Sequence, residues 1–501
     1  MVYEQIAAVD LGSNSFRLQV GRVVDDQIYP LDTLKESVRL ASGLTAEKLL
    51  DEPAQQRALE ALRRFGERLR GFAPESVRVV ATNTLRVAKN AQEFIPLAEA
   101  ALGFPIEVIG GREEARLIYI GAAHALPLAA HQRLVVDIGG GSTEFIIGTK
   151  LDPLVMESLF MGCVSYTLRF FPGGKVDRKR FADAQLSAAR EIQTIARDFR
   201  RAGWSEAAAS SGTARAIADV LEDNGLNPDA QIGITRTGLD RLRALLIRAG
   251  SAESLKLSGL PTARLPVFAG GIAIMAAVFD ELAIERMTYS EGALRLGVLY
   301  DLLGRFHHQD MRDATVAQFR RRYQVDRRQA ERVEQTALAL LDQLIHIDSP
   351  EHESEVRYLR WAAALHEIGI SIAHGGFHKH GAYIVSNADM PGFSKQDQER
   401  LAVLILGQRG KLEKLPATPV ADARWRLIFC LRAAVLLHRS RDDEPLPRVV
   451  VKPAGSGFAL ELPSDWLHAN PLSAATLADE AKLWQRVGAP LRVKRRAASA
   501  D

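Results

Sequence analysis

The sequence is poor in cysteine, with Cys163 and Cys430 as its only two in 501 residues. Two cysteines exclude a disulfide framework and a cysteine-based zinc site, and they fit a reducing compartment. We also find no long uncharged apolar run that predicts a membrane-spanning helix. The first residues, MVYEQIAAVDLG, have no basic start and enter an apolar strand at once, so we expect no secretory signal and a cytoplasmic protein.

An excess of one charge is also lacking. The 64 Lys and Arg against 61 Asp and Glu give a net charge of +3 and an isoelectric point near 8.8. This balance is not the signature of a nucleic-acid-binding protein, although clustered arginines would still suit a polyanionic ligand. The chain is too long for one core, and its length predicts roughly three or four domains.

The most informative stretch is residues 134–148, LVVDIGGGSTEFIIG, because residues 6–20, IAAVDLGSNSFRLQV, repeat its pattern. Each copy reads as an apolar strand ending in Asp, a tight turn of Gly and small polar residues, and a second apolar strand. The copies align through four pairs: Asp10 with Asp137, Gly12 with Gly139, Ser15 with Ser142, and Arg17 with Glu144. The sequence therefore predicts two equivalent hairpins.

A hairpin of this kind can bind phosphate at its tip. Glycine lets the main chain approach an anion closely and adopt positive φ. The Asp at the tip can reach a hydrated cation. For one such turn alone, an ordinary β-hairpin is the alternative interpretation. Two of them favour a duplicated domain that closes on one phosphate site.

Strands alternate with helices through the first part of the chain. We expect a strand, a polar turn and a helix at each of residues 77–90, 105–122, 207–221 and 265–279. This alternation predicts an α/β layer architecture. We expect four glycine-bearing turns to share one cleft at the strand ends: the two hairpin turns and the turns at 210–213 and 270–271.

Some of these segments carry candidate anion-binding groups. Arg86 lies in the first turns of a predicted helix, where a basic side chain is unfavourable for the helix dipole. Its side chain is therefore expected either to bind an anion or simply to be solvated. Ser211, Gly212 and Thr213 lie at a helix N-terminus that can bind an anion. Residues 270–271, a Gly pair, are expected in the last turn. Ordinary helix capping is the alternative for these last two sites.

The pattern changes towards the C-terminus, where long helices without strands begin near residue 310. The expected elements are a helix that ends the α/β part (286–303), two long helices (327–346, and 356–369 capped by Gly369), a β-rich part from Arg448, a helix (473–485) and a frayed basic tail (492–501).

The paired hairpins resemble the two phosphate motifs of the actin, sugar-kinase and heat-shock-protein superfold. More narrowly, GREEARLIY, DIGGGSTE, FMGCVSYTLRFFPGG, SGTARA and SEGALRLGVLYD resemble the exopolyphosphatase and guanosine pentaphosphate phosphohydrolase (Ppx/GppA) family. The resemblance covers nearly the whole chain. Residues 304–310, GRFHHQD, and the stretch 365–393 look closer to the long bacterial exopolyphosphatases.

This resemblance implies a fold. We expect an α/β, duplicated actin-like (ASKHA, ribonuclease H-like) phosphatase core, followed by an all-α HD-like domain and a small α+β C-terminal domain. The expected boundaries are 1–125 and 126–305 for the two actin-like domains, 310–443 for the helical domain, and 444–501 for the C-terminal domain with its basic tail.

The resemblance also implies hydrolysis of phosphoanhydrides to orthophosphate with Mg²⁺, with K⁺ as an added activator. In the family pattern Glu114 activates the attacking water, which agrees with the need for a base beside the bound phosphate. Asp137 and Glu144, which are also expected to be catalytic, would hold the metal or its waters. Asp10 would do the same from the facing hairpin. The phosphate-binding residues expected are Gly12, Ser13, Asn14, Arg17, Arg86, Gly139, Gly140, Gly141, Ser142, Thr143, Ser211, Gly212 and Thr213.

The helical part resembles an HD-type domain that has lost its metal ligands. At the position of the His-Asp pair of metal ligands this chain has His366-Glu367. An upstream His ligand is replaced near Gln329, and a later Asp ligand is replaced by Val435. We therefore expect no metal there. Its basic stretch, expected to gain charge below about pH 6.5, predicts a polyphosphate track, with a solvated loop as the alternative. The track residues are His378, Lys379, His380 and Arg409.

Four functions compete. The first is a processive exopolyphosphatase, and the second a guanosine pentaphosphate 5′-phosphohydrolase, with the tetraphosphate as a further ligand. The third is an actin-like ATP-dependent kinase or chaperone, and the fourth a non-catalytic sensor, which the retained acids disfavour. The sequence favours the first. We further expect a homodimer that binds no nucleic acid and does not insert stably into a membrane, although peripheral membrane association is compatible.

Overall fold

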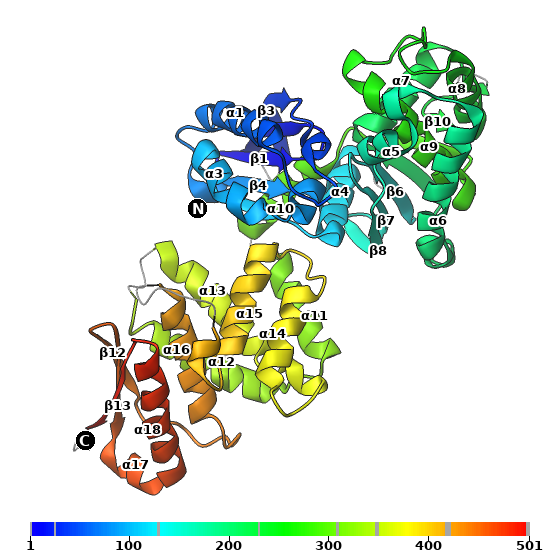
Figure 1. Cartoon of the computed structure of the whole chain (residues 1–501). Helices are drawn as coiled ribbons and strands as arrows, with labels where there is room; N and C mark the ends of the chain where they lie inside the picture. The colour runs from blue at the N-terminus through cyan, green and yellow to red at the C-terminus, as the bar shows by residue number, and fades with distance from the viewer. Residues whose placement is uncertain are drawn as a thin grey trace. The chain divides into compact units, whose positions relative to one another are not determined.

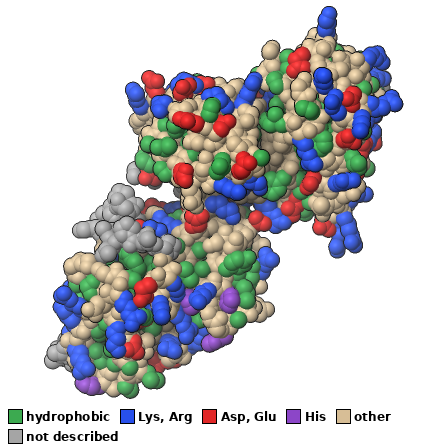
Figure 2. Space-filling model, viewed as in Figure 1, with side chains coloured by type: hydrophobic (Ala, Val, Ile, Leu, Met, Phe, Trp, Pro, Cys, Tyr) green, Lys and Arg blue, Asp and Glu red, His purple; other side chains and the backbone are tan. Residues whose placement is uncertain are grey.

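The computed structural model describes residues 3–24, 27–127, 131–228, 231–306, 310–345, 350–415 and 422–496 (Figure 1). The chain divides into two compact units, unit 1 (Met1–Asp310) and unit 2 (Met311–Asp501). Two segments of the sequence interpretation, 307–309 and the end of the basic tail at 497–501, lie outside the described residues. Acidic and basic side chains are interspersed over the visible surface (Figure 2), as the small net charge predicts.

The first half of unit 1 is built on a sheet with the strand order β3-β2-β1-β4-β5. Strands β1 and β2 form an antiparallel hairpin, while β4 and β5 run parallel to β1 and to each other. The elements are β1 (Gln5–Leu11), β2 (Phe16–Val24), β3 (Gln27–Glu36), η1 (Leu40–Gly43), α1 (Glu52–Arg68), η2 (Pro74–Ser76), β4 (Val77–Ala81), α2 (Asn83–Val87), α3 (Ala91–Leu102) and β5 (Ile106–Val108). β1 is apolar on both faces, as a central strand covered on both sides must be.

The second half of unit 1 repeats this plan in a sheet with the order β10-β11-β9-β6-β7-β8. Its central β6 pairs antiparallel with β7 and parallel with β9. The elements are β6 (Arg133–Ile138), β7 (Thr143–Thr149), β8 (Asp152–Leu159), α5 (Cys163–Phe170), η3 (Pro172–Gly174), α6 (Arg178–Ala202), β9 (Glu206–Ser210), α7 (Ser211–Asp223), β10 (Ile234–Thr235), α8 (Arg236–Ala249), η5 (Thr262–Arg264), α9 (Leu265–Glu281) and β11 (Arg286–Tyr289).

The two hairpins are equivalent in register. Asp10 pairs with Arg17 across β1 and β2, and Asp137 pairs with Glu144 across β6 and β7. Because side chains alternate along a strand, this shared register places each Asp at the corresponding tip. The predicted duplicated actin-like core is therefore confirmed.

Two helices pack where the two halves meet, α4 (Gly111–Ala125) and α10 (Leu294–Phe306). Their contact needs glycine. A methyl group on Gly121 would lie 2.0 Å from the carbonyl oxygen of Ala293, and one on Gly297 would lie 1.7 Å from that of Leu117. The sequence predicted one helix over residues 286–303. In the structure the first of these residues form strand β11, which extends the second sheet, and helix α10 starts only at Leu294.

The prediction for residues 265–279 is wrong, because they form the single helix α9. Within the described residues, the segment Thr262–Glu281 is long and apolar enough to cross a membrane, with a mean hydropathy of 1.7. In this structure 67% of that apolar stretch is buried, and α9 packs on α5 and α6. A helix that is apolar all round suits such a core position.

Unit 2 joins a bundle of helices to a small three-stranded sheet with the order β12-β13-β14. Its elements are α11 (Met311–Arg322), α12 (Arg327–Leu341), α13 (Pro350–Leu365), η6 (Ile368–Ser371), α14 (Phe377–Asn387), α15 (Lys395–Gly407), η7 (Leu412–Lys414), α16 (Arg424–Leu437), β12 (Val450–Ala454), β13 (Gly457–Pro463), α17 (Ser464–Ala469), α18 (Pro471–Arg486) and β14 (Leu491–Arg496). Helices and sheet share one core, in which Trp484 contacts Phe429 and Phe458. The division of the chain into four domains stays a prediction.

Two boundaries in unit 2 correct the sequence interpretation. Gly369 is not a helix C-cap, because α13 ends at Leu365 and Gly369 lies in η6 against the backbone of Phe377. The basic stretch 492–496, expected to be frayed, forms β14 and pairs parallel with β13. Its partner strand lies about thirty residues earlier, so local composition did not indicate the pairing.

Candidate functional site

Unit 1 contains a cavity of about 570 Å³ lined by both hairpin tips, the start of α4 and the start of α7. A volume of this size suits a small-molecule ligand. Thirteen of the predicted site residues line it: Asp10, Gly12, Ser13, Asn14, Arg17, Glu114, Asp137, Gly139, Gly140, Gly141, Ser142, Ser211 and Gly212. Three of the four expected glycine-bearing turns therefore meet in one cleft.

The two hairpin tips approach each other closely. A methyl group on Gly140 would lie 3.0 Å from Cβ of Ser13 and 3.4 Å from the backbone nitrogen of Asn14. Gly141 similarly faces Asn83 of α2, where a methyl group would lie 2.7 Å from the side-chain oxygen. Glycine at these positions is what lets the halves close on one space.

The backbone of the tips is oriented by the starts of α5 and η1. The carbonyl groups of Gly139 and Gly140 accept hydrogen bonds from the N–H groups of Cys163 and Val164, at 2.9 and 3.0 Å. In the other hairpin, Ser13 and Asn14 carbonyls accept from Ala41 and Arg39, at 2.9 and 2.8 Å. In a planar trans peptide, the N–H group that follows a carbonyl group points in the direction opposite to that carbonyl. The N–H groups that follow these four carbonyls therefore point away from α5 and η1, and the residues that carry them line the cavity.

Glu114 lies in the first turn of α4 and is buried at the cavity wall. Arg86 donates to its carboxylate at 3.1 Å. Burial raises the pKa of Glu114 to about 7, against the lowering effect of Arg86, and the nearby Asp10 and Asp137 carboxylates raise it further. A carboxyl group with a pKa near neutrality can act as a general base.

The remaining acids form a group behind and beside Glu114. Burial raises the pKa of Asp137 to about 6, although a hydrogen bond with Ser210 lowers it. Burial and the charges of Glu114 and Asp137 raise the pKa of Glu144 well above its usual range. Glu144 does not line the cavity, because it is buried and its carboxylate accepts a hydrogen bond of 2.8 Å from Ser158.

Asp10 faces this group from the other hairpin. Burial raises its pKa, against the lowering effects of Arg295 and Arg17. Its Oδ1 atom is buried and has no hydrogen-bond partner in the structure. An unpartnered buried carboxylate oxygen at a cavity wall is a natural position for a cation or a water.

Four cations of the cavity were not predicted: Lys35, Arg215, Arg264 and Arg295. They come from β3, α7, the segment before α9 and the start of α10. Two of them were within reach of sequence reasoning, since Arg215 lies in SGTARA and Arg295 in SEGALRLG, the motifs of the family resemblance. Burial lowers the pKa of Arg295 to about 10, and the nearby Arg17 lowers it further.

The start of α7 contributes differently from the expectation. Ser211 has φ of 91°, a strained value for a non-glycine residue. Its hydroxyl accepts from the N–H groups of Thr213 and Ala214, both at 3.2 Å, so it caps the helix. Gly212 makes room for Arg264, whose guanidinium would lie 1.8 Å from an added methyl group.

Three predicted phosphate ligands do not line the cavity: Arg86, Thr143 and Thr213. Arg86 binds Glu114 and the carbonyl of Ile109. Thr143 donates at 2.6 Å to the carbonyl of Met161. Thr213 packs its methyl group towards Gly271.

The glycine pair at 270–271 has a packing role. A methyl group on Gly270 would lie 2.6 Å from the carbonyl oxygen of Cys163 and 2.8 Å from the backbone nitrogen of Thr167. Helix α5 therefore occupies the space beside this pair.

A buried charge network lies behind Glu114 and joins α4, α10 and β4. Arg116 donates to Glu113 at 2.8 Å and also to Asp301, which accepts from Arg78 at 2.6 Å. The charges of Arg116 and Arg78 hold the pKa of Asp301 well below its usual range. Glu113 also pairs with Arg78 in this network.

The predicted polyphosphate track lies in unit 2. His378 is buried, and burial together with Lys414, Lys379 and Arg409 lowers its pKa to about 4. The expected gain of charge below about pH 6.5 is therefore wrong for His378. Burial and the charges of Arg432 and Lys379 also lower the pKa of Lys414, to about 8.

The residues at the HD-like positions are engaged with protein groups. Gln329 donates at 2.8 Å to the carbonyl of His438, and Arg441 forms an ion pair with Glu367. Burial lowers the pKa of His366 to about 4. Within the described ranges, no group of three or more His, Cys, Asp or Glu side chains converges closely enough to hold a metal ion alone.

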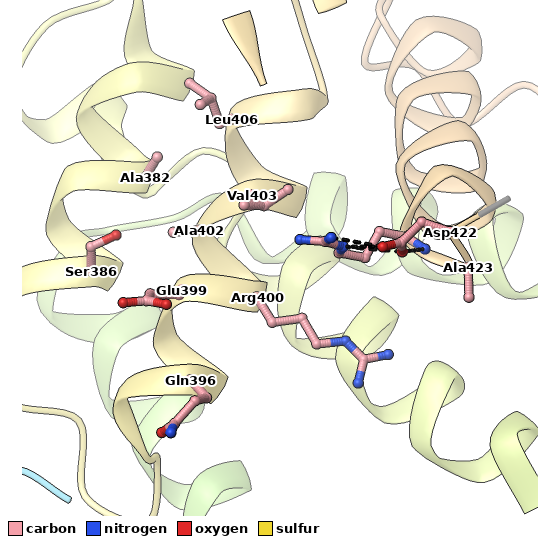
Figure 3. A pocket seen from close by; sticks show the side chains of 11 residues that line it. Ala382, Ser386, Gln396, Glu399, Arg400, Ala402, Val403, Leu406, Asp422 and Ala423 are labelled. Atoms are coloured by element: carbon pink, nitrogen blue, oxygen red, sulfur yellow. Dashed lines mark hydrogen bonds and ion pairs between the residues drawn. The ribbon is translucent and has the colours of Figure 1, made fainter. Parts of the chain in front are cut away.

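Unit 2 has a cavity of its own, of about 690 Å³, between α14, α15 and the start of α16 (Figure 3). Apolar side chains such as Val403 and Leu406 form part of its wall. Arg424 is engaged by the Asp422 carboxylate at 2.7 Å, whereas Arg400 extends from the neighbouring helix. None of the predicted site residues lines this cavity, so the candidate site is the one in unit 1.

The chain resembles known proteins in sequence. The sequence profile of the Ppx/GppA phosphatase family matches residues 19–306, and that of Ppx/GppA phosphatase, domain III, matches residues 311–481. Over 495 residues the chain is 38% identical to a guanosine-5′-triphosphate,3′-diphosphate pyrophosphatase of Aeromonas hydrophila, which aligns 97% of this chain with 98% of that protein.

Solved structures resemble about 60% of this chain. An exopolyphosphatase from Cytophaga hutchinsonii has a TM-score of 0.54 at 26% identity and covers 60% of this chain and 97% of its own. A Ppx/GppA family member from Aquifex aeolicus has a TM-score of 0.51 at 25% identity, covering 61% of this chain and 99% of its own. With two profiles that together span most of the sequence and a relative aligned over nearly its whole length, the chain belongs to the Ppx/GppA phosphatase family.

Proposed function

We propose that this protein hydrolyses the terminal phosphoanhydride bond of guanosine 5′-triphosphate 3′-diphosphate and releases orthophosphate. The observation that carries the reaction is Glu114, a buried carboxyl group with a pKa of about 7 at the wall of a cavity lined by two phosphate-type hairpin tips. The 38% identity to the Aeromonas hydrophila enzyme supports the nucleotide as substrate. This reverses the preference for polyphosphate that the sequence suggested.

The proposed step is a displacement at the terminal phosphorus. Glu114 accepts a proton from water, the water oxygen bonds to phosphorus, and the bond to the bridging oxygen breaks, so that the shortened nucleotide leaves with that oxygen. The N–H groups of the hairpin tips bind the non-bridging oxygens. Arg86 orients the Glu114 carboxylate through its 3.1 Å hydrogen bond.

Mg²⁺ fits the acids of this cavity. Asp10 and Asp137 offer oxygen ligands of the type that Mg²⁺ prefers, and the unpartnered Oδ1 of Asp10 is one position for it. Because the protein acids do not form a closed cage, substrate oxygens and water would complete the coordination. When bound, the ion would neutralise charge on the phosphate groups.

The cations of the cavity suit a highly charged nucleotide. Burial and the neighbouring Arg17, Arg264 and Arg295 all lower the pKa of Lys35, so these cations repel one another without a ligand. A substrate with a 5′-triphosphate and a 3′-diphosphate would relieve this repulsion at two places. We propose that the tips bind the 5′ chain and that these cations bind the other phosphates.

Inorganic polyphosphate is the second candidate substrate. It is favoured by the likeness of this chain to the Cytophaga hutchinsonii exopolyphosphatase, at a TM-score of 0.54. The same tips and the same Glu114 would serve, since the terminal group of the polymer is also a phosphoanhydride. The basic residues of unit 2 remain a predicted track for its remainder.

The test is phosphate release from both substrates with Mg²⁺. We expect a higher kcat/KM for guanosine pentaphosphate than for long-chain polyphosphate, and little release from either by the Glu114→Gln variant. A higher value for polyphosphate would select the second candidate. If the wild type binds both ligands without releasing phosphate, the enzyme function is wrong and a sensor takes its place.

A further inference from the structure

One face of helix α7 runs along the cavity. Ser211, Arg215 and Asp219 are four residues apart and all line it, as expected for positions on one side of a helix. Asp219 is two turns, or about 12 Å, beyond the phosphate-type turn at the start of α7. Asp219 is therefore not part of the phosphate-type turn, and its carboxylate does not suit a phosphate ligand.

Asp219 is one of five cavity-lining residues that come from α7 beyond its first turn and from the segment before α9, and we name this set the α7 slot: Arg215, Ala216, Asp219, Pro261 and Ala263. Ala216 is buried, whereas Pro261 and Ala263 are exposed on the segment that precedes α9. The slot thus combines small apolar surfaces, one planar guanidinium and one carboxylate. Apolar surfaces and guanidinium planes are the groups on which nucleobases stack.

The Asp219 carboxylate is weakly engaged by the protein. Its ion pair with Arg215 spans 3.6 Å, and the two side chains are 44% and 58% exposed. A pair of this kind contributes little free energy. Replacing this ion pair by a contact between Asp219 and a ligand therefore costs little free energy.

We propose that the α7 slot binds the base of a guanine nucleotide and that Asp219 selects it by accepting hydrogen bonds from N1–H and the 2-amino group. This inference rests on the proposed function and adds the residue that determines base specificity. In guanine these two donors are adjacent on the Watson–Crick edge and match the two carboxylate oxygens. Adenine has an acceptor at N1 and no amino group at C2, so its edge repels the same carboxylate.

The position of the slot fits the shape of the substrate. In a nucleoside 5′-triphosphate the ribose and the inner phosphates separate the base from the terminal phosphate. The slot likewise lies beyond the phosphate-type turn at the start of α7, where Arg264 packs against Gly212. Polyphosphate has no base and gains nothing from Asp219, so the two candidate substrates depend on this residue differently.

The test is an exchange of base specificity in the full chain. Asp219→Asn keeps one acceptor for N1–H but presents an amino group, which matches the 2-oxo group of xanthine instead of the 2-amino group of guanine. We expect kcat/KM for guanosine 5′-triphosphate 3′-diphosphate to fall roughly 10- to 100-fold, the range for loss of a bidentate base contact. The xanthosine analogue should become the better substrate, while polyphosphate hydrolysis stays within about twofold of wild type.

The matched control is Asp223→Asn, one turn further along α7, where the side chain is exposed and does not line the cavity. It should leave the preference for guanosine unchanged. An equal loss of activity on both nucleotides by Asp219→Asn, or no loss at all, would overturn the inference.

Failure of the proposed function has a different outcome. If the wild type releases no phosphate from guanosine pentaphosphate, the reaction is wrong, and calorimetric binding of the same two nucleotides then tests the slot. If wild type binds the guanosine nucleotide more tightly and Asp219→Asn binds the xanthosine nucleotide more tightly, Asp219 selects the base even though the protein does not catalyse the reaction. Equal affinity of wild type for both nucleotides contradicts it.

Discussion

Arg86 donates one hydrogen bond to the carboxylate of Glu114, at 3.1 Å, and another to the carbonyl of Ile109, at 2.9 Å. The guanidinium thus ties the acid at the start of α4 to the loop before that helix. It fixes the direction of the carboxylate and partly offsets the cost of burying its charge. Both effects make Glu114 suitable as a base at neutral pH.

Glu114→Gln tests the proton acceptor. We expect kcat to fall about 10²- to 10⁴-fold, the usual contribution of a general base, with substrate affinity retained because the amide fills the same space. Initial rates and equilibrium binding of the nucleotide measure the two effects. Glu93→Gln, also a first-turn helix acid but exposed, should be unaffected. Equal rates for Glu114→Gln and wild type would remove the base from the mechanism.

Arg86→Gln tests the electrostatic role of the pair. Arg86 lowers the pKa of Glu114, which burial raises to about 7. Without that cation the carboxyl group stays protonated to a higher pH, so the acidic limb of the kcat/KM profile should move upwards. Arg86→Lys keeps the charge and should move the limb less. A profile that shifts to lower pH in the Gln variant would contradict this account.

Asp137→Asn should stabilise the ligand-free protein while reducing turnover. Burial raises the pKa of Asp137 from 3.8 to about 6, so between these values the folded state binds more protons than the unfolded state. Its stability therefore falls as the pH rises, and the loss is complete above about pH 6. The gain in the variant should be on the order of 2–3 kcal/mol at pH 7.5 and near zero at pH 4.

Chemical unfolding at the two pH values measures this difference. Asp183→Asn, at an exposed position on α6, is the control and should change stability little at either pH. A variant that is less stable than wild type at pH 7.5 would show that the Asp137 charge is favourable in the folded state.

Asp301→Asn should destabilise unit 1 by about 3–5 kcal/mol, because it leaves Arg78 and Arg116 buried beside a neutral group. The control is Asp240→Asn, which removes the partner of Arg243 in a partly exposed ion pair of α8 and should cost about 0.5 kcal/mol or less. Denaturant unfolding of both variants gives the comparison. Equal losses would mean that the buried network adds no more than a surface pair.

Gly140→Ala tests the approach of the two hairpin tips. The added methyl group would lie 3.0 Å from Cβ of Ser13, so the tips must move apart by a few tenths of an ångström. Because phosphoryl transfer depends on positioning, we expect kcat/KM to fall on the order of 10-fold or more. Gly110→Ala, where an added methyl group has no neighbour within 4 Å, is the control. A full rate in Gly140→Ala would mean that tip contact is dispensable.

Where the determinants were local, the sequence was sufficient. The hairpins were predicted because alternation, an Asp and a Gly-rich turn lie within fifteen residues, and their repetition excluded chance. The helix that carries Glu114 was also predicted from local pattern, whereas the place of Glu114 in the site was implied by the family resemblance. Such signals are short, and neither needs knowledge of a distant partner.

The errors came where a distant partner decided the structure. An apolar stretch with a glycine pair was interpreted as strand and turn at residues 265–279, yet the pair is a contact surface for α5 within one helix. The basic stretch 492–496 became a strand because β13 offers it an edge. Local composition cannot indicate a helix contact or a strand pairing that forms only on folding.

The sequence by itself thus determined the duplicated hairpins, the family resemblance and the acid at the start of α4. The tertiary structure alone decided that Lys35, Arg264 and Arg295, from three separate elements, line the same cavity as Arg17. It also decided which predicted phosphate ligands point into the protein core instead of the cavity, such as Thr143. The physical reason is that a motif encodes backbone shape through neighbouring residues, whereas the charge of a site is the sum of side chains that only folding brings together.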